Sequence, residues 1–234
     1  MDPRHLPVDK RLTGCCVFCG GPPDTRDHVP SRILLDEPLP AYLPVVDACG
    51  GCNQSFSLDE EYLACLLDCV LSGTADPEGL QRKKVRLALS HNPKLTKMLD
   101  KCKRVDEAGR LVWQPQDDRV RNTVLKLARG HAAYELSLPQ LEDPLEVTAA
   151  PFVAMSEEQH SGFEDALGGT IQGWPEVGSR AFHRACGAAP DPLEEDRGWV
   201  VVQPGRYRYC VMQTGGVLVQ MVLSEYLACR VVWD

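Results

Sequence analysis

Apolar and polar residues alternate along the last third of the chain, a pattern typical of strands with one buried face. The alternation is clearest at Tyr207, Tyr209 and Val211, and at Leu227, Cys229, Val231 and Trp233. Four strands are predicted, at residues 199–203, 206–213, 217–223 and 226–233. We expect an antiparallel sheet with one covered face against which the tyrosines pack. Stacking of the tyrosine rings on nucleic-acid bases is the alternative.

Between residues 57 and 134 the apolar residues recur at helical spacing instead. Ser57 begins a capping-box pattern. Asp76 and Asn92 each precede a proline that suits the first position of a helix. Asp117 is predicted to cap a helix that reaches about residue 134. His131 lies on the apolar side of that helix, so we expect a core histidine rather than a metal ligand.

Shorter elements complete the prediction. They are strands near residues 24–29, 43–48 and 145–154, a hairpin at 104–113 and a helix at 156–167. Residues 168–193 have the composition of a loop. The fold class is therefore α+β, with central helices and a C-terminal antiparallel β-sheet.

Composition excludes several classes of protein. Of the 234 residues, 44% are apolar and 25% are charged, which is ordinary for a globular chain and argues against a disordered or fibrous one. The densest apolar run, residues 62–67, falls far short of the roughly 18 residues of a membrane span. The first fourteen residues contain no hydrophobic stretch of signal-peptide type. We expect a cytoplasmic protein that does not contact a membrane.

Basic residues concentrate in the centre of an acidic chain. The net charge is −8, yet residues 81–129 hold fourteen Lys or Arg and five Asp or Glu, a local charge of +9. The other residues therefore carry −17. The overall charge argues against a general DNA-coating protein, but a basic centre fits a polyanion held in one place. Solvated helix faces are the alternative explanation.

Four of the eleven cysteines form two C-x2-C pairs. These are Cys16 with Cys19 and Cys49 with Cys52. Four thiolates in two short pairs can share one tetrahedral zinc ion, which is favoured here over free thiols or redox chemistry. The remaining cysteines lie in apolar surroundings and are predicted to be small buried residues.

Three polar residues accompany these pairs. Asp27 and His28 lie in the 29-residue gap between the pairs, and Asn53 directly follows the second pair. This combination resembles the HNH endonucleases of the ββα-metal, or His-Me finger, class. The likeness is greatest to their zinc-bearing members, which include phage junction-resolving endonucleases. It covers residues 15–67 and rests on seven positions that agree in type and order.

The resemblance implies a domain organisation and a reaction. Residues 1–73 would form a zinc-stapled ββα-metal nuclease module, residues 74–138 a basic helical region, and residues 139–234 an α/β region that ends in the antiparallel sheet. The zinc would be structural. The module would hydrolyse phosphodiester bonds in DNA and leave 5′-phosphate and 3′-hydroxyl ends, with RNA as the alternative substrate.

Each candidate residue has a chemical role in such a reaction. His28, neutral near pH 7, can accept a proton from water as the general base. Asp27 and Asn53 offer hard oxygen ligands that suit Mg²⁺ or Mn²⁺. A third ligand from Asp59 or Glu60 is a weaker alternative. Neighbouring residues on a regular strand point to opposite faces, so we expect irregular backbone at residues 27–29.

A second hypothesis comes from another class of protein. The chain could be a non-catalytic zinc-binding module that contacts nucleic acid or protein, as the acidic remainder of the chain allows. The C-terminal sheet is a candidate surface for a protein partner or for self-association.

Overall fold

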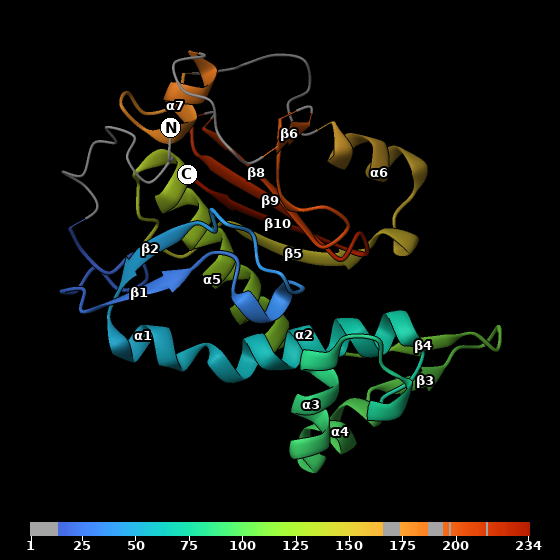
Figure 1. The fold of residues 1–234 in the computed structure, drawn as a ribbon. Helices are drawn as coiled ribbons and strands as arrows, with labels where there is room; N and C mark the ends of the chain where they lie inside the picture. Colours follow the sequence, from blue (N-terminus) through green and yellow to red (C-terminus); the bar gives the residue numbers. More distant parts are fainter. Residues whose placement is uncertain (1–13, 166–173, 187–193, 197, 214) are drawn as a thin grey trace. The chain divides into compact units, whose positions relative to one another are not determined.

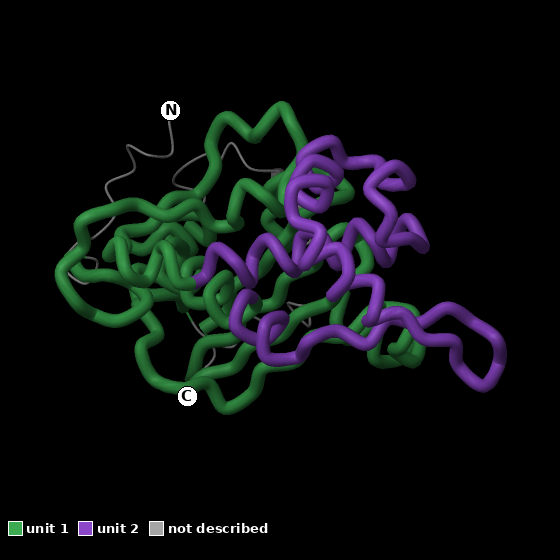
Figure 2. Tube along the Cα trace, turned by 90° about the horizontal axis from the view of Figure 1, so that it is seen from below, with its two compact units in different colours: residues 1–55, 124–234 green, residues 56–123 purple. Residues whose placement is uncertain are grey.

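The computed structural model describes residues 14–165, 174–186, 194–196, 198–213 and 215–234. The chain divides into two compact units (Figure 2). Unit 1 contains residues 1–55 and 124–234, and unit 2 contains residues 56–123. We describe each unit by itself. The three functional segments expected from the sequence remain a prediction.

Unit 1 contains a six-stranded antiparallel sheet (Figure 1). Its strands, in spatial order, are β5 (Glu146–Pro151), β10 (Leu227–Trp233), β9 (Val217–Leu223), β8 (Tyr207–Gln213), β7 (Trp199–Gln203) and β6 (Glu194–Asp196). The four strands predicted from alternation are confirmed. The predicted strand at 145–154 is β5, at one edge of the sheet, while β6 at the other edge was not predicted.

One face of the sheet packs against helix α5 (Asp117–Leu136), whose residues from 124 onward belong to unit 1. Tyr207 and Tyr209 are fully buried there, so their alternation reflects packing. His131 is also fully buried: its Nε2 lies 2.8 Å from the Tyr207 hydroxyl, and its ring stacks on Tyr209. The prediction of a core histidine is confirmed.

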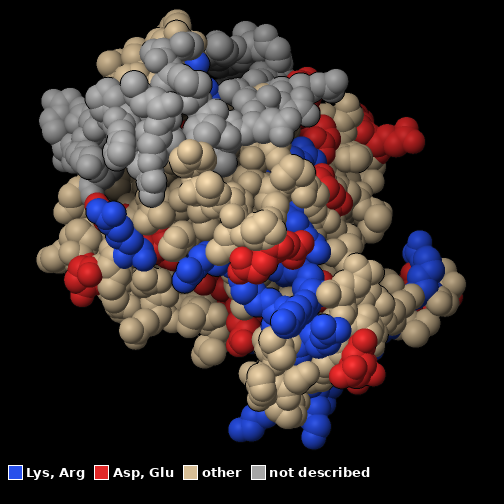
Figure 3. All heavy atoms as spheres, in the orientation of Figure 1, with Lys and Arg blue, Asp and Glu red and all other residues tan. Residues whose placement is uncertain are grey.

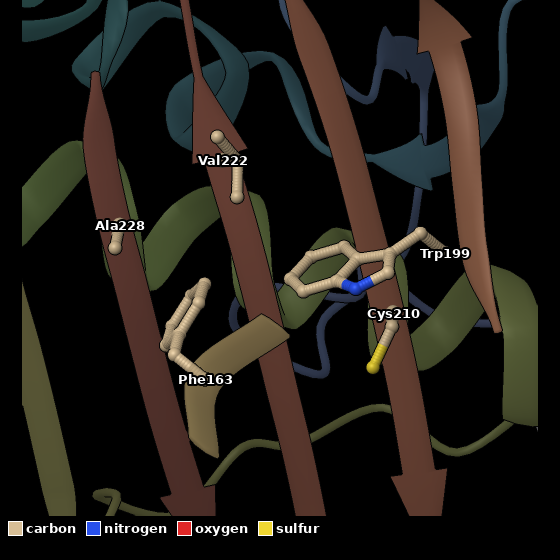
Figure 4. Packing of buried hydrophobic residues seen from close by; sticks show 5 residues of the cluster. All are labelled: Phe163, Trp199, Cys210, Val222 and Ala228. Atoms are coloured by element: carbon tan, nitrogen blue, oxygen red, sulfur yellow. The ribbon is translucent and has the colours of Figure 1, made fainter. Parts of the chain in front are cut away.

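The opposite face is covered in part by helix α6 (Glu157–Glu164). Its Phe163 packs on Trp199, Cys210, Val222 and Ala228, which come from four different strands (Figure 4). The expectation of one covered face is therefore wrong. The capping box of Ser156 with Gln159 begins α6, as the predicted helix at 156–167 requires, although residues 166 and 167 lie outside the described part of the chain.

Smaller elements complete unit 1. Strands β1 (Thr25–His28) and β2 (Val45–Ala48) form an antiparallel hairpin, followed by helix α1 (Gly50–Ser55). A short helix, α7 (Arg180–Ala185), lies within the segment that was predicted to be a loop. Two 3₁₀ turns, η2 (Arg32–Leu34) and η4 (Phe152–Ala154), join longer elements.

Unit 2 is mostly helical. It contains α2 (Ser57–Ser72), η3 (Pro77–Gly79), α3 (Lys83–His91), α4 (Pro93–Asp100) and the hairpin of β3 (Lys103–Val105) with β4 (Leu111–Trp113). Tyr62 anchors its core, because the ring is buried and its hydroxyl accepts a hydrogen bond from the Gln116 amide at 2.8 Å. The apolar sides of α3 and α4 add Val85, Leu89, Leu95 and Leu99 to the buried residues.

Of the three helix-start signals in unit 2, one forms the predicted helix cap. The side chain of Asn92 accepts a hydrogen bond from the Leu95 amide and caps α4 as predicted. Asp76 caps only the single 3₁₀ turn η3, so the predicted start is wrong; the helix of this segment, α3, begins later, at Lys83. Helix α2 exists, but Phe56 is its N-cap and no side-chain cap forms, so the capping box at Ser57 is wrong.

Candidate functional site

The four cysteines of the two C-x2-C pairs lie together. The sulfur atoms of Cys16, Cys19, Cys49 and Cys52 are all within 4.8 Å of one another, and those of Cys19 and Cys49 are 3.8 Å apart. Four ligands at the usual zinc–sulfur distance of about 2.3 Å in a tetrahedron have sulfurs about 3.8 Å apart. This cluster can therefore hold a metal ion such as zinc.

Backbone hydrogen bonds build the first cysteine pair. The Cys16 amide donates to the Gly21 carbonyl at 2.7 Å, and the Gly20 amide donates to the Cys16 carbonyl at 2.8 Å. Gly20 has a φ of 75°, which permits the tight turn. The Val17 amide donates to the Asp47 carbonyl at 3.1 Å, so the pair is tied to strand β2.

The second pair continues from the hairpin into helix α1. Cys49 follows the last residue of β2, and Cys52 lies within α1. The side chain of Asp24, just before β1, accepts a hydrogen bond from the Gly50 amide at 2.6 Å. The cluster thus joins the loop before β1, the end of β2 and the start of α1.

The environment of the thiols affects their protonation unequally. Burial raises the pKa of the Cys16 thiol, but backbone hydrogen bonds at Cys49, Phe18 and Cys19 outweigh burial and lower that pKa to about 7. Burial and the three neighbouring sulfurs raise the pKa of Cys52. The cluster therefore favours a thiolate at Cys16 first.

Strand β1 carries the Asp-His pair in regular register. Asp27 pairs with Val46, and His28 with Val45, without a shift. The expected irregular backbone is wrong for these two residues, because the strand ends only after His28, where the Val29–Pro30 peptide is cis. Side chains alternate along a regular strand, so Asp27 and His28 leave it on opposite faces.

Asp27 forms a buried ion pair. Its Oδ2 lies 2.6 Å from the Nζ of Lys126 on α5, and these side chains are 12% and 1% exposed. Lys126 also donates to the Ser31 hydroxyl at 3.0 Å. Lys126 is one of the fourteen basic residues of segment 81–129, and its buried side chain is not available to a polyanion.

His28 is half-buried at the end of β1. Burial lowers the pKa of its imidazole, the charges of Arg32 and Lys126 lower it further, and Asp27 acts in the opposite sense. These surroundings favour the neutral form of the His28 imidazole. A neutral imidazole is the form that can accept a proton.

Asn53 ties helix α1 to strand β1. Its Nδ2 lies 3.3 Å from the Thr25 hydroxyl and 3.3 Å from the Arg26 carbonyl, and donates to both. The amide group thus stabilises the strand that carries Asp27 and His28. This leaves the carbonyl oxygen of Asn53 as the atom that would face a cation.

The weaker candidate ligand, Asp59, has a structural role within unit 2. Its two carboxylate oxygens accept hydrogen bonds from Arg119 at 2.6 Å and from Asn122 at 2.7 Å. The guanidinium of Arg119 also lies over the Tyr62 ring. Asp59 is thereby held as part of the packing around α2.

The basic segment is only partly available to a ligand. Arg82 and Lys126 are buried, and Arg119 is paired with Asp59. On the face drawn in Figure 3, Lys and Arg side chains cluster with Asp and Glu side chains among them. Contact with DNA through the remaining cations stays a prediction.

Sequence reasoning missed the contact between α5 and the hairpin. Lys126 and Gly130 are four residues apart on one side of α5. A Cβ atom at Gly130 would lie 2.5 Å from a methyl carbon of Val29. A lysine and a glycine at positions on the apolar side of α5 were the signal, but the sequence of one chain does not indicate which segment they meet.

Comparison of this chain with protein-family models, with curated proteins and with solved structures finds no match. The resemblance to HNH endonucleases therefore rests on the residues of the sequence and stays a prediction. Within the described residues, no helix is both long enough and apolar enough to cross a membrane. The cytoplasmic location stays a prediction.

Proposed function

We propose that this chain is a metal-dependent endonuclease of the HNH type that hydrolyses phosphodiester bonds in DNA. The observation that carries the proposal is the local chain order. A hairpin with Asp27 and His28 on its first strand leads directly into a helix with Asn53, and the four-cysteine cluster joins these segments. The side-chain hydrogen bonds of Asn53 to β1 add support.

The chain's own residues would divide the work. His28, neutral and half-exposed at the end of β1, would take a proton from the attacking water. Asp27 and the carbonyl oxygen of Asn53 would hold Mg²⁺ or Mn²⁺. Because Asp27 and His28 leave β1 on opposite faces, the end of the strand would have to turn for both to reach one phosphate. When bound, that ion would neutralise the phosphate and assist the departing 3′ oxygen. Zinc bound by the four cysteines would keep β1 and α1 together.

A plasmid-nicking assay tests the proposal. Wild-type protein should nick supercoiled DNA when Mg²⁺ is added, and His28→Ala should lose roughly 100-fold or more of that rate. His91→Ala is the matched control, because His91 is exposed in unit 2 and should be dispensable. Equal zinc content in all three proteins would show that the fold is retained. Equal rates for wild type and His28→Ala would overturn the proposal.

A second function is favoured by one observation. The carboxylate of Asp27 already has a cation beside it, the ammonium group of Lys126 at 2.6 Å. A divalent ion would have to bind next to Lys126 or displace it. If Asp27 is purely structural, the hairpin is a zinc-binding interaction module without catalysis. No Mg²⁺-dependent nicking by pure, zinc-loaded wild-type protein would favour this function.

A further inference from the structure

The β3–β4 hairpin of unit 2 exposes apolar side chains. Val105 is 71% exposed, Leu111 48% and Val112 39%. The two strands form a sheet of their own, and Figures 1 and 2 show the hairpin extending beyond the helices of its unit. Two-stranded ribbons are marginally stable in water by themselves. Three exposed apolar side chains on such a ribbon therefore suggest a binding element.

Polar contacts support the ribbon at its tip and at its base. At its tip, the Asp106 carboxylate accepts hydrogen bonds from the Ala108 and Arg110 amides at 3.0 and 2.8 Å, and pairs with the Arg110 side chain. At its base, the Lys103 ammonium lies 5.4 Å from the centre of the Trp113 ring, directly across the strands. A rigid element loses little conformational entropy on binding.

Pairing across the ribbon sets its two faces. Val105 is paired with Leu111, and both side chains project from the same face near the tip. Arg104 is paired with Val112 on the other face. The apolar pair at the tip is thus available to a partner without rearrangement of the strands.

Charge indicates the kind of partner. Residues 82–113, which include α3, α4 and the ribbon, hold ten Lys or Arg and three Asp or Glu, a charge of +7 in a chain of −8. Lys101, Arg104 and Arg110 are exposed next to the apolar pair. This combination complements a polyanion that also offers apolar contacts.

We propose that the β3–β4 ribbon enters the major groove of duplex DNA. The groove is about 12 Å wide and admits a two-stranded ribbon, whose strands lie about 4.8 Å apart. Val105 and Leu111 would contact base edges, where thymine methyl groups provide apolar surface. Lys101 and Arg110 would contact phosphates. The inference rests on the proposed function, which makes DNA the substrate.

Binding by full-length protein, measured apart from cleavage, tests the ribbon. His28→Ala protein is titrated into fluorescent duplex DNA, single-stranded DNA and duplex RNA, and anisotropy is recorded. Duplex DNA should bind most tightly, because the narrow major groove of A-form RNA excludes a ribbon. Adding Val105→Ser and Leu111→Ser should weaken duplex binding roughly tenfold or more. Val153→Ser is the matched control, since Val153 is 85% exposed in unit 1.

A second variant tests the cations. Lys101→Gln with Arg110→Gln should reduce the salt dependence of duplex binding, with a fall of about 1 to 2 in the slope. Unfolding curves of each variant should match those of the parent protein. Equal affinity for duplex DNA and duplex RNA would overturn the proposal. Unchanged affinity for duplex DNA after the ribbon substitutions would also overturn it. The same holds if ultracentrifugation shows that the ribbon mediates self-association instead.

The two proposals fail separately. If wild-type protein binds duplex DNA through the ribbon but never nicks it, only the proposed nuclease function is refuted. Nicking by a wild-type protein whose ribbon variants bind and nick equally well would refute the ribbon alone.

Discussion

Replacing Lys126 with methionine tests the contact between α5 and strand β1. The substitution keeps the length of the side chain and removes the ammonium group, which lies 2.6 Å from Asp27 and 3.0 Å from Ser31. Asp27 would remain as a buried charge without the Lys126 ammonium group beside it. At that separation the Coulomb attraction is about 6 kcal/mol for an effective dielectric constant near 20. Desolvation offsets part of it.

We expect Lys126→Met to lower the free energy of unfolding by about 3 kcal/mol, the lower end of the range for breaking a buried pair. The lower end applies because the Asp27 side chain is 12% exposed. Urea unfolding at pH 7.5, with free zinc held constant, measures the change. Lys97→Met is the control, because Lys97 is exposed and should change stability by less than about 0.5 kcal/mol.

The double variant Asp27→Asn with Lys126→Met completes the cycle. Removing both charges should lower the free energy of unfolding by at least about 1 kcal/mol less than the sum of the two single losses. The double variant keeps neither charge of the pair, so neither is buried without the other. Additive losses, or a Lys126→Met protein as stable as wild type, would refute the reasoning. The double variant also separates the two roles of Asp27. If its stability is restored but it does not nick DNA, Asp27 takes part in the reaction.

Three further predictions follow from the same region. Cys49→Ser should lose the bound zinc, about one ion per chain by metal analysis, whereas Cys186→Ser, an exposed cysteine outside the cluster, should keep it. Gly130→Ala should lower the free energy of unfolding by about 1 kcal/mol or more. The added methyl group would press on buried Val29, and this outweighs the preference of alanine for helices. Thermal unfolding measures the change, and unchanged stability would contradict the prediction. Burial and Lys126 hold the pKa of His131 well below 6.5, so the neutral form is favoured in the folded state. The contribution of His131 to the free energy of unfolding is therefore complete above pH 6.5. It falls as the pH drops below that value, by at most about 1.4 kcal/mol per pH unit. In urea unfolding between pH 7 and 5, the free energy of unfolding of His131→Gln should depend less on pH than that of wild type.

The elements of this fold were predictable where one pattern dominates. Alternation predicts strands β8 and β10 of the sheet, and the helix after Asn92 follows from a side chain that accepts a hydrogen bond from the Leu95 amide. Ser57 and Asp76 show the limit of such local signals. Each has the residues of a cap, but Phe56 takes the N-cap position of α2 in place of Ser57, and the chain after Asp76 makes only one 3₁₀ turn.

The cysteine ligands of the candidate site could be predicted from the sequence, but the contacts of the residues around them could not. Two short cysteine pairs meet because each pair is locally compact, and their sulfurs do lie together. The burial of Lys126 against Asp27 joins residues 99 positions apart, and no spacing rule relates them. The regular register at Asp27 and His28 likewise depends on β2, which the local sequence of β1 does not specify.

The most direct test of the account is nicking of supercoiled plasmid by pure, zinc-loaded protein with and without Mg²⁺. Wild type should give Mg²⁺-dependent nicks with 5′-phosphate ends, His28→Ala almost none, and His91→Ala the full activity. Nicking that persists in His28→Ala at the wild-type rate would contradict it.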